Sequence, residues 1–160
     1  MKKLYLAMSL AICLASAPLT TYAQAKKAKS AAVTMNETQK EKQQFAYGFY
    51  KTYMNSLIYP QLADLSTVIA KKFVSPKVLK KTADTGGDVL LDAQDCIEEN
   101  VRTLQVVPIN NDWFCVAFMW TSTYDKIQSQ KKVIYIKVKQ QGNSFIIEDA
   151  TSEKPKLTKI

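Results

Sequence analysis

The chain has 160 residues, 47% of them hydrophobic and 22% charged, with a formal net charge of +8. That length is enough for one domain with an adequate core. The sequence has no histidine, which excludes Ser-His-Asp and Cys-His catalysis and removes the commonest metal ligand. The excess charge lies near the termini, since residues 43–152 carry only +1, so we expect no folded basic surface for nucleic acid.

The first 25 residues have the pattern of a secretory signal peptide. Two lysines precede an apolar run over residues 4–17, and a small-residue stretch follows, with cleavage expected after Ala23 or Ala25. The run is shorter than the roughly 20 residues that a transmembrane helix needs. We therefore predict an exported protein, periplasmic or extracellular, with no transmembrane segment.

The rest of the chain divides by composition. Residues 26–36 are polar and small and predict a flexible linker, and residues 152–160 form a basic tail. Residues 37–151 lie between them and contain all the periodic segments. We expect them to form the single folded domain.

The domain begins with a long helix. Asn36 with Gln39, or Thr38 with Glu41, fits a capping box at its start, and Pro60 ends it. Apolar residues recur at spacings of three and four and predict one buried face: Phe45, Phe49, Tyr50, Tyr53, Met54, Leu57 and Ile58.

Two shorter helices and a sheet should follow. One helix is predicted at residues 62–73, and another begins at Ser75-Pro76 and stops near Gly86-Gly87. The period then changes to two and predicts antiparallel strands at residues 102–109, 112–124, 131–140 and 144–150. The expected fold class is α+β, with a long N-terminal helix and two shorter ones packed on a curved four-stranded sheet.

The second predicted strand has an unusual composition. Residues 113–120 contain no polar residue on either face, whereas the third strand alternates between apolar residues and lysines. Both faces of the second strand should therefore be covered. We expect a cone-like sheet that partly encloses a cavity.

This order of elements resembles the nuclear-transport-factor-2-like (cystatin-like) fold, and in particular a family of small exported bacterial proteins of unknown function. The similarity lies in the aromatic first helix, residues 45–53, and in the segment Asp-Val-Leu-Leu-Asp-Ala-Gln-Asp at residues 88–95. The family usually has asparagine where this chain has Asp92. The resemblance implies a fold and no established activity.

Six acidic residues with no basic residue among them precede the first strand: Asp84, Asp88, Asp92, Asp95, Glu98 and Glu99. Asp88, Asp92 and Asp95 fall at helical intervals, which would place them on one face. Three roles are open: a metal site, although the spacing matches no known calcium loop; an acidic surface for a basic partner; and ordinary loop and cap contacts.

The candidate ligand or partner residues combine these acids with aromatic residues: Tyr50, Asp88, Asp92, Gln94, Asp95, Trp113 and Trp120. Trp113 and Trp120, with Tyr124 and Tyr135, belong either to the core or to the lining of an open cone. In an enzyme of this fold, a buried Asp92 or Asp95 could act as a base, with Tyr47 or Tyr50 beside it.

The expected mature chain keeps two cysteines, Cys96 and Cys115. An even number in an exported protein favours a disulfide. The predicted turn at Asn110-Asn111 argues against a disulfide, because this turn places Cys115 across from Val106 and not across from Cys96. A disulfide and two buried thiols both remain open.

The sequence favours a non-catalytic protein that binds a small ligand or a protein partner in the cell envelope, as a monomer or homodimer, with no cofactor. Two alternatives remain: an immunity protein that offers residues 84–99 to a secreted toxin, and an enzyme with an aspartate base.

Overall fold

The computed structural model describes residues 35–93, 95–121 and 129–156. The chain divides after Val33 into two units, and the described residues belong to the second, Thr34–Ile160. The predicted signal peptide, most of the linker, Gln94, Tyr124 and the end of the basic tail lie outside the described residues. Among the described helices, none combines the length and the apolar character that a membrane span requires.

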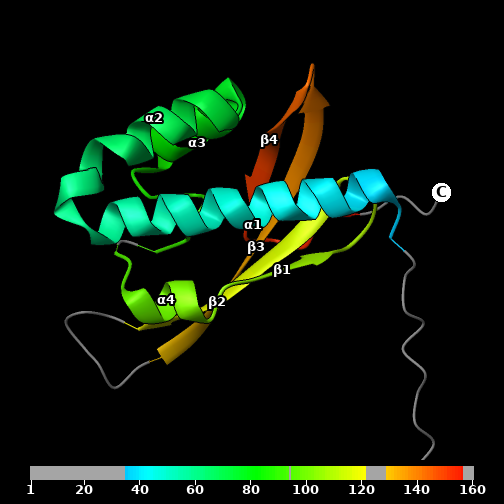
Figure 1. Cartoon of the computed structure of the whole chain (residues 1–160). Helices are drawn as coiled ribbons and strands as arrows, with labels where there is room; N and C mark the ends of the chain where they lie inside the picture. Colours follow the sequence, from blue (N-terminus) through cyan, green and yellow to red (C-terminus); the bar gives the residue numbers. More distant parts are fainter. Residues whose placement is uncertain (1–34, 94, 122–128, 157–160) are drawn as a thin grey trace, which may run out of the picture. The chain divides into compact units, whose positions relative to one another are not determined.

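Helix α1, Glu37–Ile58, crosses one face of the sheet (Figure 1). The Asn36 side chain accepts a hydrogen bond from the Gln39 amide at 2.8 Å, so Asn36 and not Thr38 is the cap. The helix ends before Pro60, as predicted. The predicted apolar face is buried at Phe49, Tyr50, Tyr53 and Met54, but Leu57 is an exception because it is 43% exposed.

Of the two shorter helices that follow, the first lies beside α1, and both contact strand β4. Helix α2 spans Ala63–Phe73, after a short 3-10 turn at Pro60–Leu62, and α3 spans Pro76–Thr85. The Ser75 side chain caps α3 by accepting a hydrogen bond from the Val78 amide, and its hydroxyl donates to the Glu148 carbonyl at 2.9 Å. Helix α3 ends at Gly86, whose φ of +65° suits glycine. These features confirm the predicted start and stop signals.

A short helix that was not predicted from the sequence, α4, spans Glu98–Arg102. Buried Asn100 holds it in place: its side-chain oxygen accepts a hydrogen bond from the Ile97 amide at 2.6 Å, and its amide group donates to the Met119 carbonyl. The first strand therefore begins at Gln105 and not at residue 102 as predicted. The partner of Asn100 lies 19 residues away, so local periodicity could not indicate this helix.

The four strands form one antiparallel sheet in the order β1-β2-β3-β4, which confirms the predicted meander. The strands are β1 (Gln105–Pro108), β2 (Trp113–Thr121), β3 (Ser129–Gln141) and β4 (Ser144–Thr151). The β3–β4 register shifts between Lys137 and Val138. Helices packed on this sheet make the domain α+β, as expected.

The two faces of β2 are buried to different extents. Phe114, Val116 and Phe118 are at most 2% exposed and belong to the main core. On the other face Ala117 is buried, but Trp113, Cys115 and Met119 are only half-buried, and Val107, opposite Cys115, is 53% exposed. The described helices cover the first face and leave the second partly open, so the expectation that both faces are covered is not met by the described residues.

The N-terminal half of α1 is fixed to the β1–β2 turn by polar contacts. The Gln39 side chain donates to the Asn110 carbonyl at 3.0 Å, and the Lys42 ammonium lies 2.5 Å from a carboxylate oxygen of Asp112. Gln39 and Lys42 are both buried, so their polar groups need these partners. The contacts set the position of α1 along the sheet.

Candidate functional site

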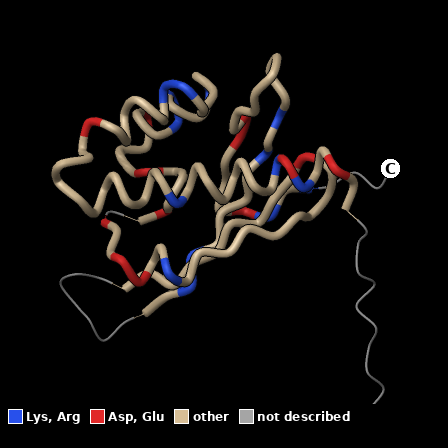
Figure 2. The backbone as a smooth tube through the Cα atoms, viewed as in Figure 1, with Lys and Arg blue, Asp and Glu red and all other residues tan. Residues whose placement is uncertain are grey.

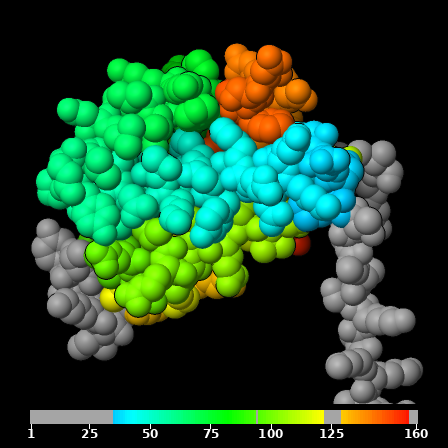
Figure 3. Space-filling model, viewed as in Figure 1, coloured from blue at the N-terminus to red at the C-terminus, as the bar shows by residue number. Residues whose placement is uncertain are grey.

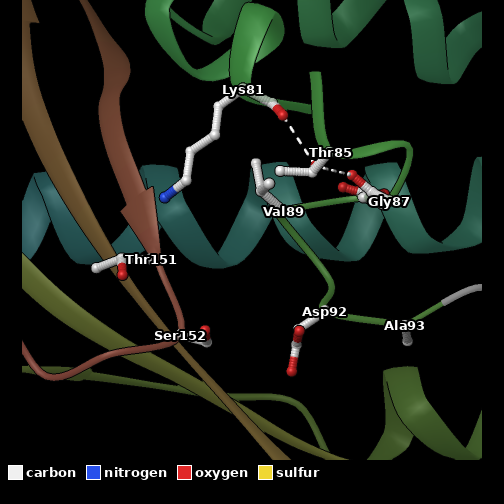
Figure 4. Close-up of a pocket in the computed structure, with 9 residues that line it drawn as sticks. Lys81, Thr85, Gly87, Val89, Asp92, Ala93, Thr151 and Ser152 are labelled. Atoms are coloured by element: carbon white, nitrogen blue, oxygen red, sulfur yellow. Dashed lines mark hydrogen bonds between the residues drawn. The ribbon is translucent and has the colours of Figure 1, made fainter. Parts of the chain in front are cut away.

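A pocket of about 370 Å³ opens between the C-terminal end of α3, the turn after it and the end of β4 (Figure 4). We call it the Lys81–Asp92 pocket, after the charged residues on two sides of it. Its lining consists of Lys81, Thr85, Gly87, Asp88, Val89, Asp92, Ala93, Thr151 and Ser152. Two of the residues predicted from the sequence, Asp88 and Asp92, are therefore part of one pocket wall.

Asp88 fastens the turn after α3 to helix α1. One carboxylate oxygen accepts a hydrogen bond from the Tyr53 hydroxyl at 2.8 Å, and the other accepts one from the Leu90 amide at 2.8 Å. Burial raises the pKa of Asp88, and the hydrogen bonds from Tyr53 and from the Leu90 and Leu91 amides oppose that rise. With both oxygens occupied, Asp88 fits the role of an anchor better than that of a catalytic base.

Tyr50 lies one helical turn before Tyr53 and is completely buried. Its hydroxyl has no hydrogen-bond partner among the described residues. Burial raises its pKa well above the ordinary value, and the neighbouring charges of Asp88 and Tyr53 raise it further. The predicted residue Tyr50 therefore belongs to the core beneath the Asp88 anchor and is absent from the pocket lining.

Asp92 is the only described residue other than glycine with a positive φ, at +52°. Aspartate and asparagine adopt this left-handed conformation more readily than most side chains. The Asp92 carboxylate is exposed and lies 3.5 Å from the Lys132 ammonium. Asp92 lines the pocket at the end away from Lys81 (Figure 4).

Trp120 and Lys132 hold the next part of the same segment against the sheet. The Trp120 indole N–H donates to the Asp95 carboxylate at 2.8 Å, and the Lys132 ammonium lies 5.2 Å from the Trp120 ring centroid. Asp95 and Trp120, both predicted as site residues, thus contact each other. They do not line the Lys81–Asp92 pocket.

The remaining pocket residues were missed from the sequence. Lys81 lies on α3 and its ammonium donates to the Ala150 carbonyl at 3.0 Å, while Thr151 and Ser152 follow at the end of β4. Helix α3 and β4 are separated by about 60 residues of chain, and only the packing of α3 against β4 brings them together. No local spacing signals this contact.

The acidic residues between 84 and 99 do not form one continuous helix: Asp84 lies in α3, and Glu98 and Glu99 lie in α4. Residues 88–93 form turns with a bridge between Asp88 and Ala93, so the predicted helical face of Asp88, Asp92 and Asp95 is wrong. Five of the six acids contact other side chains: Asp88 with Tyr53, Asp92 with Lys132, Asp95 with Trp120, Glu98 with Tyr59 and Glu99 with Arg102. Within the described residues, no group of three acids or cysteines is placed to hold a metal ion.

The two predicted tryptophans lie apart from each other. Trp120 packs against the core beside Asp95, whereas Trp113 alternates with the buried residues of β2 and lies on the opposite face of the sheet. Neither of them lines the Lys81–Asp92 pocket. The expected cone interior is occupied by core side chains such as Phe114 and Ile136.

Cys96 and Cys115 are free thiols, so the disulfide alternative is wrong for this structure. Cys96 packs against the core, and Cys115 lies on the other face of β2, opposite Val107 and not opposite Val106 as expected. Burial raises the pKa of Cys96 to about 12, with the charge of Asp95 adding to the effect. A thiol with such a pKa is protonated and unreactive at neutral pH.

Comparison with known proteins adds a structural neighbour of unknown function. A protein of Bacteroides thetaiotaomicron matches with a TM-score of 0.61 and 24% sequence identity, over 71% of this chain and 90% of its own. No family model matches the chain. No curated protein matches it either. These findings show the fold alone, and the resemblance to the nuclear-transport-factor-2-like family is not confirmed.

Proposed function

We propose that this domain binds a small zwitterionic molecule in the Lys81–Asp92 pocket. The proposal depends on one observation: an ammonium and a carboxylate border the same hollow from different sides (Figure 4). A ligand with a carboxylate at one end and an ammonium at the other would place each charge next to its opposite. Such charge-assisted hydrogen bonds are stronger than neutral ones.

The rest of the lining is consistent with this chemistry. Thr85, Thr151 and Ser152 supply hydroxyl groups that both donate and accept hydrogen bonds, and Val89 and Ala93 supply a small apolar surface. A volume of about 370 Å³ is within the range of small-molecule sites, roughly 300–1,000 Å³. A free amino acid or a dipeptide fits this description, and the predicted export would place such binding in the cell envelope.

Isothermal titration calorimetry with the dipeptide alanyl-alanine tests the proposal. We expect binding by the dipeptide and at least about tenfold weaker binding by its N-acetyl and C-terminal amide analogues, each of which lacks one charge. Lys81→Met should weaken binding of the dipeptide but change little for the amide analogue. Asp92→Asn keeps the left-handed conformation available. It should weaken binding of the dipeptide and change little for the N-acetyl analogue, which lacks the ammonium group.

The controls are charged neighbours outside the pocket. Lys80→Met and Asp84→Asn remove the same charges from exposed positions of α3 that do not line it, and should leave affinity within about twofold. If both analogues bind as tightly as the dipeptide, or if the control variants lose as much affinity as the pocket variants, the proposal is wrong.

A further inference from the structure

A second hollow lies between α1 and α2, and it has a different chemistry. Its volume is about 290 Å³, and its lining consists of Gln44, Phe45, Gly48, Phe49, Thr52, Ile69 and Phe73. We call it the Phe45–Phe73 groove. The two helices that form it lie side by side on the face of the molecule shown in Figure 3. It shares no residue with the Lys81–Asp92 pocket.

The groove has an aromatic floor that the fold does not fully cover. The Phe45 ring contacts the rings of Phe73 and Phe145 at centroid distances of 5.7 and 5.8 Å, yet Phe45 and Phe73 both stay only half-buried. On α2, Val68 is next to the groove residue Ile69 and is 58% exposed. An apolar chain placed here would remove this aromatic and aliphatic surface from water.

Gly48 gives a second indication that something approaches the groove from outside. It lies in the middle of a 22-residue helix, where glycine costs about 0.5–1 kcal/mol relative to alanine. A Cβ at this position would meet nothing within 4 Å, and the backbone φ is that of a normal helix. The packing of the domain therefore gives no reason for glycine here, whereas close approach of a ligand to the helix backbone does.

The charge at the rim indicates the ligand class. The Lys72 ammonium lies 5.1 Å from the centroid of the Phe73 ring, and the groove lining contains no acidic residue. An anionic head group is complementary to this rim. The volume of the hollow, about 290 Å³, is close to the lower end of the range for small-molecule sites, roughly 300–1,000 Å³.

From these observations we propose that the Phe45–Phe73 groove binds a free monoacyl carboxylate, with the alkyl chain along the aromatic floor next to Gly48 and the carboxylate at Lys72. This site is independent of the proposed zwitterion pocket. Burial of the chain supplies most of the affinity, and the carboxylate at Lys72 fixes its direction.

The test uses decanoate below its micelle concentration, with binding followed by calorimetry and by NMR shifts of the α1 and α2 amides. Gly48→Leu should place a side chain in the groove and weaken binding at least about tenfold. Thr67→Leu adds the same side chain at an exposed position of α2 outside the groove and should leave affinity within about twofold.

The head group is tested separately. Lys72→Met should weaken decanoate binding about threefold to fivefold and leave binding of neutral decanamide unchanged, whereas Lys71→Met should affect neither. Phosphatidylglycerol vesicles distinguish a free acyl anion from a membrane surface, and we expect no co-sedimentation. Equal affinity in Gly48→Leu and Thr67→Leu, or binding to vesicles without binding of decanoate, overturns the proposal.

Discussion

Two regions of the domain are stabilised in different ways: the inner face of β2, and the segment of residues 88–96 that lies against α1 and the sheet. On β2, fully buried Phe114 and Val116 pack against apolar neighbours with no specific polar partner. The 88–96 segment instead attaches through single polar contacts, above all from Asp88 to Tyr53 and from Asp95 to Trp120. Apolar packing is spread over many atoms, whereas the attachment depends on a few groups. Substitutions in the two regions should therefore differ in size and in pH dependence.

The largest expected effect is in the β2 core. Phe114→Ala should lower the free energy of unfolding by about 3–5 kcal/mol, because the side chain is 0% exposed and its removal leaves a cavity. Trp113→Ala, at the adjacent half-buried position on the other face, is the matched control and should cost less than half as much. Urea denaturation of both variants measures the difference. Equal losses would show that the outer face of β2 is covered as well as the inner one.

The next effect concerns the Asp88 anchor. Asp88→Ala should cost roughly 2 kcal/mol, because it leaves the Tyr53 hydroxyl and the Leu90 amide without their acceptor. Asp88→Asn keeps one acceptor oxygen and should cost less. Urea denaturation gives the free energies, and amide hydrogen exchange should show the loss of protection confined to residues 88–93. Loss spread evenly over the sheet would contradict a local anchor.

These two regions also explain how much the sequence could predict. Helix α1 and the strands follow from repeated apolar spacing, because many residues contribute to the same signal. Asp88 and Asp92 could be selected because they stand in an unusual acidic segment. The relative positions of the acidic side chains could not be predicted, because Gly86 and Asp92 adopt left-handed conformations that interrupt helical spacing.

Contacts between distant residues account for the remaining errors. The Asn100 side chain attaches α4 to the Met119 carbonyl, and Lys81 lines the same pocket as Thr151 and Ser152 only because α3 packs on β4. For the apolar outer face of β2, the sequence predicted a contact that the described residues do not make. Its composition predicts a covered face, but composition does not say whether another element covers it.

A smaller effect separates the two buried tyrosines of α1. Tyr53→Phe removes a hydroxyl that is bonded to Asp88 and should cost about 1 kcal/mol. Tyr50→Phe removes a buried hydroxyl with no partner among the described residues and should be neutral or stabilising by up to about 1 kcal/mol. Thermal and urea unfolding of both variants test this. A loss in Tyr50→Phe as large as in Tyr53→Phe would show that both hydroxyls take part in the anchor.

The smallest effect is the pH dependence of the anchor. Burial raises the pKa of Asp88 above its ordinary value of 3.8, so the folded protein holds this proton more tightly than the unfolded chain. The contribution of Asp88 to stability is therefore greatest below pH 3.8 and declines as the pH rises through the raised pKa. Asp88→Asn cannot ionise, so its stability relative to the wild type should improve as the pH increases from about 3.5 to about 7. Urea titrations of both proteins across this range, with exposed Asp84→Asn as the control, measure the trend. A constant difference would show that Asp88 titrates equally in the folded and unfolded states and that its buried environment does not matter.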